Sequence, residues 1–164
     1  MVTLPSGAVV TVLPSEYVTV ELGGLSARVL DVPGHTSGHI AYWFEAESVA
    51  FVGDTLFAMG CGRLFEGTAE QMFASLQSLG GLPDSMRLYP AHEYTLANAR
   101  FAAHADPGNA ALADRLKQVI ALREAGTITL PTTVALERET NPFVRASNWQ
   151  DFARLRSAKD SFGS

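Results

Sequence analysis

Three side chains suited to metal chemistry stand at the ends of predicted strands. His35 lies in a loop between two apolar runs, Asp54 ends the apolar run that begins near Val49, and His92 follows a run that ends at Tyr89. Side chains at the ends of neighbouring strands can converge on one edge of a sheet. Neutral imidazole and carboxylate groups suit zinc or iron, and a carboxylate can bridge two ions. The residues therefore raise the hypothesis of a metal site.

A simpler interpretation stays open at this point. A single histidine or aspartate at a strand end is usually structural or merely exposed, and no His-x-His pair ties these ligands together. Cys61 lies between two glycines close to the same motifs. A single buried thiol is usually inert, so we assign it no catalytic role.

The elements that must position these side chains change in type along the chain. Short β-rich runs separated by turn signals predict an antiparallel sheet, with strands over 8–13, 17–22, 27–32, 40–44 and 49–52. Thr68 and Gln71 then form a capping-box sequence before an apolar stripe, which predicts a helix ending at residues 80–81. A further strand is predicted over 86–89.

The rest of the sequence is predicted to be helical. Helices are expected up to about residue 104, over 109–125, after Thr132 and over 148–161, and Pro107-Gly108 marks a division. The prediction is therefore an α+β protein made of two domains, residues 1–104 and 105–164.

The composition narrows the class of partner. The chain has 164 residues, 47% of them hydrophobic, and a net charge of −5, so it can form a globular core and lacks the basic character of a nucleic-acid binder. No apolar run reaches the ~18 residues of a membrane span, and no leader pattern is visible. Cys61 is the only cysteine, which excludes an internal disulfide and favours a reducing cytoplasm. We expect a small-molecule partner.

Several motifs resemble a known family. These are PGHTSGHI at 33–40, GDTLF at 53–57, GCGRLFEGT at 60–68, AHEYT at 91–95, NPFVR at 141–145 and RSAKDSF at 156–162. In order and spacing they are similar to the hydroxyacylglutathione hydrolases, the glyoxalase II family of the metallo-β-lactamase fold. The likeness covers nearly the whole chain, including the helical part.

The resemblance implies a role for each candidate metal ligand. His35 would bind the first of two divalent ions, His92 the second, and Asp54 would bridge both and be central to catalysis. Zinc is the expected metal, with iron or manganese as alternatives. His39 is not a ligand in the family pattern and is expected to pack or to support the ligands, whereas His104 is expected to be exposed.

The resemblance also implies a glutathione-binding surface formed by Arg63, Phe65, Tyr94, Arg156 and Lys159. Guanidinium and ammonium groups suit the two carboxylates of glutathione. Arg156 and Lys159 are three residues apart on a predicted helix and share a face, although without the resemblance we would interpret this as a solvated face. Phe65 stands where the family often has Tyr, so one hydrogen bond to the peptide is expected to be absent.

One family motif is not found. The resemblance implies a four-layer αββα sandwich followed by a small helical domain. The motif Thr-His-x-His-x-Asp-His, which supplies two further ligands to each ion, should precede His35, yet none of the 34 preceding residues is His. We therefore expect the chain to contain only the C-terminal half of the sandwich. A fragment, a misplaced start or a truncated gene would explain this. Such a chain would have an incomplete metal site, an uncovered apolar sheet face and no activity alone.

Three functions are compatible with these observations. The first is hydrolysis of S-2-hydroxyacylglutathione, typically S-D-lactoylglutathione, to glutathione and D-lactate in methylglyoxal detoxification, by a monomer when complete. The second is a glutathione persulfide dioxygenase with one iron on the same fold, which the HEYT motif and the helical C-terminal part disfavour. The third is a non-catalytic protein that binds glutathione conjugates or another polypeptide, which the absent motif favours for the chain alone.

Overall fold

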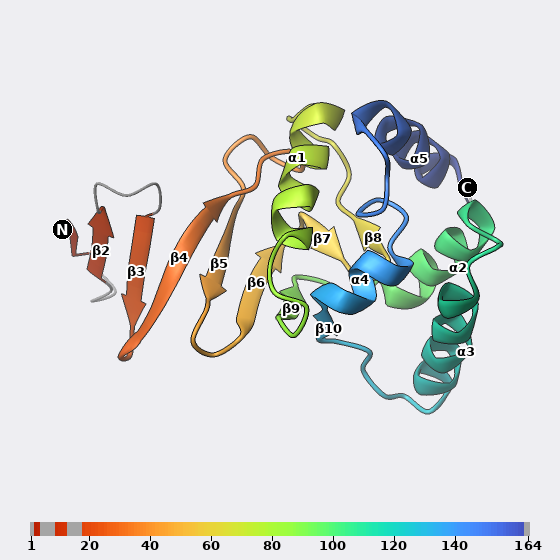
Figure 1. Cartoon of the computed structure of the whole chain (residues 1–164), viewed down its shortest axis with the longest axis horizontal. Coiled ribbons are helices and arrows are strands. Elements are labelled where there is room, and N and C mark those ends of the chain that lie inside the picture. The colour runs from red at the N-terminus through yellow and green to blue at the C-terminus, as the bar shows by residue number, and fades with distance from the viewer. Residues whose placement is uncertain (1, 4–8, 13–17, 163–164) are drawn as a thin grey trace.

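The computed structural model describes residues 2–3, 9–12 and 18–162, and these form a mixed sheet, a small hairpin and a set of helices (Figure 1). The strands are β1 (Val2–Thr3), β2 (Val9–Val12), β3 (Val18–Leu22), β4 (Leu25–Asp31), β5 (Ile40–Phe44), β6 (Val49–Gly53), β7 (Leu56–Phe57), β8 (Gly60–Cys61), β9 (Arg87–Pro90) and β10 (Thr132–Thr133). The helices are α1 (Ala69–Gly80), α2 (Thr95–Ala105), α3 (Ala110–Glu124), α4 (Val134–Thr140) and α5 (Trp149–Ser161). The predicted α+β class is confirmed.

The main sheet has the strand order β1-β2-β3-β4-β5-β6-β9-β10, and β7 pairs with β8 apart from it. Strands β1 to β6 are antiparallel, as predicted, and β9 joins β6 in parallel through a crossover that contains α1. The carboxyl ends of β6 and β9 therefore meet at one edge of the sheet.

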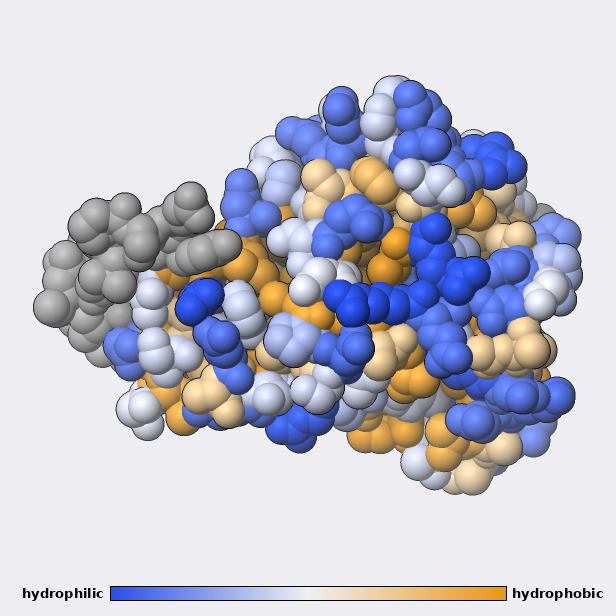
Figure 2. All heavy atoms as spheres, in the orientation of Figure 1, coloured by the Kyte–Doolittle hydropathy of each residue, from blue (hydrophilic) through white to orange (hydrophobic). Residues whose placement is uncertain are grey.

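Helix α1 covers one face of this sheet (Figure 1). Its capping box is formed, because the Thr68 side chain accepts from the Gln71 amide while the Gln71 side chain accepts from the Thr68 amide. Its apolar stripe packs with the sheet residues in one core, whose members include Leu30, Ala41, Ala50, Val52, Met72, Leu76, Leu79 and Leu88. Hydrophilic side chains gather over α1 and α5 on the viewed side (Figure 2). The helix thus separates this core from solvent.

The opposite sheet face carries apolar side chains that remain accessible. The pairing register places Tyr42 next to Phe51 on the neighbouring strand, and Phe51 next to Tyr89. Ile40, Tyr42 and Phe51 are 40%, 38% and 47% exposed. This is the apolar sheet face that the sequence predicts to be uncovered.

The helical part has a smaller core of its own. Met59, at the tip of the β7–β8 hairpin, is buried in it together with Ala99, Ala102, Leu112 and Val119. The predicted helices agree with α2 to α5, and the division at residues 104 and 105 stays a prediction. None of the helices in the described part of the chain is long and apolar enough to cross a membrane.

Candidate metal and substrate site

Two of the candidate ligands meet at the sheet edge formed by β6 and β9. Asp54 follows β6 and His92 follows β9, and the two strands are in register at Gly53 and Pro90. The Nε2 atom of His92 lies 3.3 Å from Oδ1 of Asp54. Parallel pairing of these strands is therefore what brings together residues 38 positions apart in the sequence.

His35 reaches the same edge from the loop between β4 and β5, and a backbone carbonyl fixes its ring. Its Nδ1 atom lies 2.9 Å from the carbonyl oxygen of Arg63. Because a carbonyl oxygen only accepts, Nδ1 must carry the proton, so in the neutral tautomer Nε2 is the nitrogen available to a metal. This arrangement is the usual support for a metal-binding histidine.

The two glycines around Cys61 allow the chain segments of the site to approach closely. A Cβ atom at Gly62 would lie 2.0 Å from the carbonyl oxygen of Asp54 and 3.1 Å from Nδ1 of His35. At Gly60 it would lie 2.4 Å from Nδ2 of Asn98. Packing therefore requires both glycines, because a larger residue at Gly62 would push the Asp54 backbone away and one at Gly60 would displace the Asn98 side chain.

His39 supports Asp54 through the backbone. Its Nε2 atom accepts a hydrogen bond of 3.0 Å from the amide of Asp54, and its ring fills the space beside Gly53. His39 does not line the cavity described below. The expectation that it supports the ligands and does not act as one agrees with this position, and His104 is exposed, as predicted.

All eight predicted site residues line one cavity of about 670 Å³. The three candidate ligands and the five candidate glutathione contacts thus share one space, whose lining includes His35, Asp54, Arg63, Phe65, His92, Tyr94, Arg156 and Lys159. Their individual roles stay predictions.

The cations of this cavity differ in how accessible they are. The Arg63 side chain is 70% exposed, whereas that of Arg156 is only 7% exposed. Arg156 donates to the carbonyl oxygen of Cys61 and to Asp160, both at 2.9 Å. Its buried Nε atom has no hydrogen-bond partner among the described residues. Arg156 is therefore not on a solvated helix face. Its hydrogen bond to Cys61 joins α5 to the β7–β8 hairpin.

Lys159 lies between these extremes. Its ammonium group donates to the carbonyl oxygen of Ala97 at 3.1 Å and lies over the ring of Phe101. Partial burial, and then the nearby charge of Arg156, lower the pKa of Lys159. The ammonium group is therefore partly desolvated, which strengthens its attraction for a ligand carboxylate.

Aromatic rings form the wall beside His92. The ring of Tyr94 stacks on His92 with centroids 4.9 Å apart, and Phe57 meets Tyr94 at 5.2 Å. Phe65 is 69% exposed and lies 4.9 Å from the ring of His35. Burial raises the pKa of Cys61 to about 11, so this thiol stays protonated at neutral pH and is inert, as expected.

Seven further residues line the cavity, and the sequence interpretation gave none of them a role at the site: Phe57, Cys61, Gly62, Ala97, Asn98, Asp160 and Phe162. Phe57, Asp160 and Phe162 lie within motifs that carried the resemblance, but no role followed for them from residue type. Asn98 lies in no motif, and no sequence signal indicates it. Asp160 contacts both Arg156 and Arg63, at 2.9 and 3.8 Å, and is the carboxylate that pairs with these two cations.

The donor types fit a divalent ion, but their number is small. Two imidazoles and one carboxylate are zinc ligands, and His35 presents a free ring nitrogen. The described residues contain no group of three or more His, Cys, Asp or Glu side chains that could hold a metal ion. His35, Asp54 and His92 therefore fit as part of a ligand set. Shared between two ions, they would give each ion one imidazole and one carboxylate, short of the three or more protein ligands usual for catalytic zinc.

Comparison with known proteins identifies the class. Residues 4–92 match the metallo-beta-lactamase superfamily, and residues 93–162 match the hydroxyacylglutathione hydrolase C-terminus. The fold is similar to the crystal structure of ETHE1 from Myxococcus xanthus, with a TM-score of 0.59 and 27% identity over 85% of this chain and 48% of that one. Membership of this superfamily implies divalent metal binding.

Relatives narrow the family further. The chain is 58% identical to the hydroxyacylglutathione hydrolase of Methylococcus capsulatus over 82% of this chain and 52% of that protein. It is 53% identical to that of Acidiphilium cryptum, over 88% of this chain and 59% of that protein. The chain therefore belongs to the metallo-beta-lactamase superfamily and, within it, to the hydroxyacylglutathione hydrolase family. It spans between half and three fifths of the length of these two relatives.

Proposed function

We propose that this chain carries part of the metal site and the glutathione-binding surface of a thioester hydrolase. The reaction is hydrolysis of S-2-hydroxyacylglutathione, with S-D-lactoylglutathione as the typical substrate, to glutathione and D-lactate. One observation carries the proposal: a single cavity holds His35, Asp54 and His92 beside the cations Arg63 and Lys159. The names of the relatives support the same chemistry.

The metal side of the proposal assigns His35 to one ion, His92 to another, and Asp54 to both. Zinc is the ion we propose, with iron or manganese as alternatives. Bound divalent ions would polarise the thioester carbonyl and lower the pKa of a water molecule. The chain itself orients the ligands, because the carbonyl of Arg63 holds His35 and the ring of His39 holds the backbone of Asp54.

The substrate side of the proposal assigns the glutathione carboxylates to the cations. Arg63 is exposed and Lys159 is partly desolvated, so both are available for charge-assisted hydrogen bonds. Arg156 lines the same cavity and would add its positive charge beside the bound ligand. The rings of Tyr94 and Phe65 flank the ligand-bearing histidines and would contact the peptide or the acyl group.

A second candidate function is binding of glutathione conjugates without hydrolysis. The specific observation in its favour is the small number of ligand-type side chains grouped in the described part of the chain. The match of residues 93–162 to the hydrolase C-terminus supports the first candidate.

Complementation separates these candidates. The part of the Methylococcus capsulatus protein that precedes its aligned region is fused before this chain, and hydrolysis of S-D-lactoylglutathione is measured with zinc present. We expect activity in the fusion and none in the 164-residue chain. Asp54→Ala should abolish this activity, whereas His104→Ala, a matched change at an exposed position, should not.

Two outcomes would overturn the hydrolase proposal. A folded, zinc-loaded fusion that binds S-hexylglutathione but hydrolyses nothing would favour the binding function. Oxygen uptake with glutathione persulfide, in place of thioester hydrolysis, would assign the chain to the dioxygenases.

A further inference from the structure

The tip of the β7–β8 hairpin has an unfavourable backbone conformation. Met59 has a φ of 54°, in the left-handed region that side-chain-bearing residues rarely adopt. Its side chain is fully buried in the core shared by α2 and α3. The strained conformation persists because the surrounding structure fixes it, and such sites are often functional.

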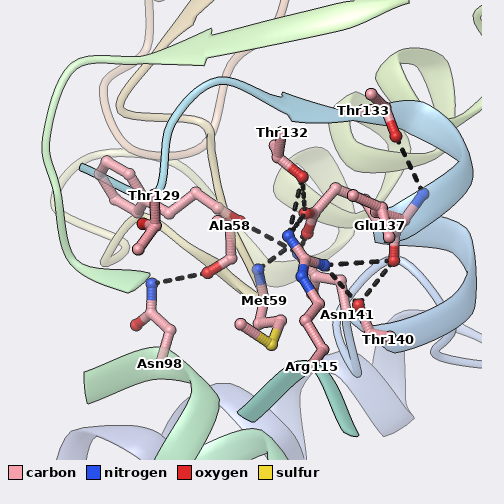
Figure 3. Close-up of polar contacts among 12 residues, drawn as sticks. Ala58, Met59, Asn98, Arg115, Thr129, Thr132, Thr133, Glu137, Thr140 and Asn141 are labelled. Carbon is pink, nitrogen blue, oxygen red and sulfur yellow. Dashed lines mark hydrogen bonds and ion pairs between the residues drawn. The ribbon is translucent and has the colours of Figure 1, made fainter. Parts of the chain in front are cut away.

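Side chains of the helical part satisfy the backbone of this tip (Figure 3). The amide of Met59 donates to Oε2 of Glu137 at 2.8 Å. Asn141 donates to the carbonyl oxygens of Phe57 and Gly60, at 3.2 and 3.0 Å. Asn98 donates to the carbonyl oxygen of Ala58 at 3.2 Å. The hairpin tip is therefore held by residues 40 to 84 positions further along the chain.

Glu137, which accepts from the Met59 amide, is itself held by donors on the side away from the hairpin. Glu137 is completely buried, and its Oε1 atom accepts from Arg115 at 2.8 Å and from Thr132 at 2.5 Å. Its Oε2 atom accepts from Asn141 at 2.9 Å in addition to the Met59 amide. Because two donors fix each oxygen, the carboxylate has one orientation, which sets the position of the Met59 amide.

The same short hairpin forms part of the cavity wall. Phe57 and Cys61 line the cavity, whereas neither Glu137 nor Asn141 does. The ring of Phe57 lies 5.2 Å from that of Tyr94, and the carbonyl oxygen of Cys61 accepts from Arg156. A displacement of the tip would therefore move both the aromatic wall and the partner of Arg156.

We propose that Asn141 and Glu137 are positioning residues for the substrate cavity. They act through the backbone of the β7–β8 hairpin, which they fix so that Phe57 and Cys61 keep their places beside Tyr94 and Arg156. The choice of ligand for the test rests on the proposed function, whereas the mechanical role of the two residues does not.

The test compares two Asn→Ala variants in the 164-residue chain. Asn141→Ala removes the donors to the hairpin. Asn109→Ala is the matched control, because Asn109 caps α3 and bonds the carbonyl of Glu139 without touching the hairpin. Nuclear Overhauser contacts between Phe57 and Tyr94 and exchange of the Met59 amide are measured without ligand. The Kd for S-hexylglutathione is measured where unfolding curves show both variants folded.

We expect Asn141→Ala to lose the ring contact, to accelerate exchange of the Met59 amide at least tenfold and to raise the Kd at least tenfold. Asn109→Ala should change none of these. If Asn141→Ala does not fold, Thr132→Val loosens Glu137 from the far side and should accelerate Met59 exchange by a smaller factor.

Three results would overturn the proposal: a folded Asn141→Ala with wild-type ring contact and exchange, equal effects in Asn109→Ala, or unchanged Met59 exchange in Thr132→Val. Absence of S-hexylglutathione binding by the wild-type chain would count against the proposed function instead, and the ring contact and amide exchange would still decide the positioning role.

Discussion

Two pairs of a carboxylate and a basic side chain, Arg115 with Glu137 and His92 with Asp54, differ in burial and in hydrogen bonding. In the pair of Arg115 and Glu137, the side chains are 10% and 0% exposed, and every acceptor position has a donor (Figure 3). In the pair of His92 and Asp54, the side chains are 51% and 26% exposed. Among the described residues, only His92 bonds or pairs with the Asp54 carboxylate.

This difference distinguishes a structural carboxylate from one that can bind a ligand. A buried carboxylate must be fully paired, since an unpaired buried charge is costly, and such a group has no capacity left for a ligand. Asp54 keeps free acceptor positions at a sheet edge, and the chain controls it through its backbone, by way of His39. Side-chain hydrogen bonds thus hold the buried carboxylate of the scaffold, whereas the carboxylate of the candidate ligand Asp54 keeps acceptor positions accessible.

The largest expected effect breaks the buried pair. Glu137→Ala leaves Arg115 as an uncompensated buried cation and removes the acceptor of the Met59 amide. We expect a loss of about 3–5 kcal/mol in the free energy of unfolding, measured with urea. Glu139→Ala, two residues further in the same helix and exposed, should stay within about 0.5 kcal/mol of wild type. Similar values for the two variants would refute the structural role assigned to the buried pair.

A smaller effect is expected when the hydrogen bond that supports the backbone of Asp54 is removed. In the complemented enzyme, His39→Ala should weaken zinc binding by about 10–100-fold, because the Asp54 backbone loses its hydrogen bond. Calorimetric titration measures this, and His104→Ala should leave the affinity unchanged. The 164-residue chain should bind zinc weakly and below one ion per chain. Tight binding of two ions by that chain would show that ligands have been overlooked.

The cation cluster should respond more modestly. Lys159→Ala should raise the Kd for S-hexylglutathione by roughly tenfold, which corresponds to ~1.4 kcal/mol for one charge-assisted contact. Lys117→Ala is the control, because Lys117 is exposed and pairs with Asp114 away from the cavity. Equal Kd values for Lys159→Ala and wild type would remove Lys159 from the proposed binding surface.

Local patterns predicted most of the regular elements. The helix ends agree because their signals are short-range: the Thr68 and Gln71 capping box is formed, and Asn109 and Asn148 each cap a helix through the amide three residues on. The antiparallel strands follow from alternation and turn residues. The convergence of eight candidate residues in one cavity was expected from the family resemblance, since spacing alone left the metal site undecided.

The features that the sequence did not predict depend on long-range contacts. β7, β8 and β10 have two residues each, too few for a periodic pattern. The burial of Arg156 depends on a hydrogen bond to Cys61, 95 positions earlier. The buried carboxylate of Glu137 looks like any charged residue of an amphipathic helix until its partners from other elements are placed. Tertiary packing decides such cases, and no local signal carries it.

The smallest expected effect concerns a third carboxylate, intermediate between the two compared above. Glu66 is exposed, yet its Oε2 atom accepts from the Ser37 amide at 2.7 Å and from the Ser37 hydroxyl at 3.0 Å. The backbone hydrogen bond from Ser37, and then the one from its side chain, lower the pKa of Glu66. This contact joins the loop of His35 to the loop of Arg63.

The sign of the pH dependence follows from that lowered pKa. The contact stabilises the fold at pH values above the ordinary carboxyl pKa, and its contribution is lost as the pH falls through the lowered pKa of Glu66. An NMR titration should therefore show the Ser37 amide moving with a midpoint below that of an ordinary glutamate. Ser37→Ala removes only the hydroxyl donor, so the midpoint should rise part of the way, while Glu66→Gln should abolish the transition. A wild-type midpoint at the ordinary value would mean that the two loops are joined by their backbone bonds alone, such as that from the Phe65 amide to the His35 carbonyl.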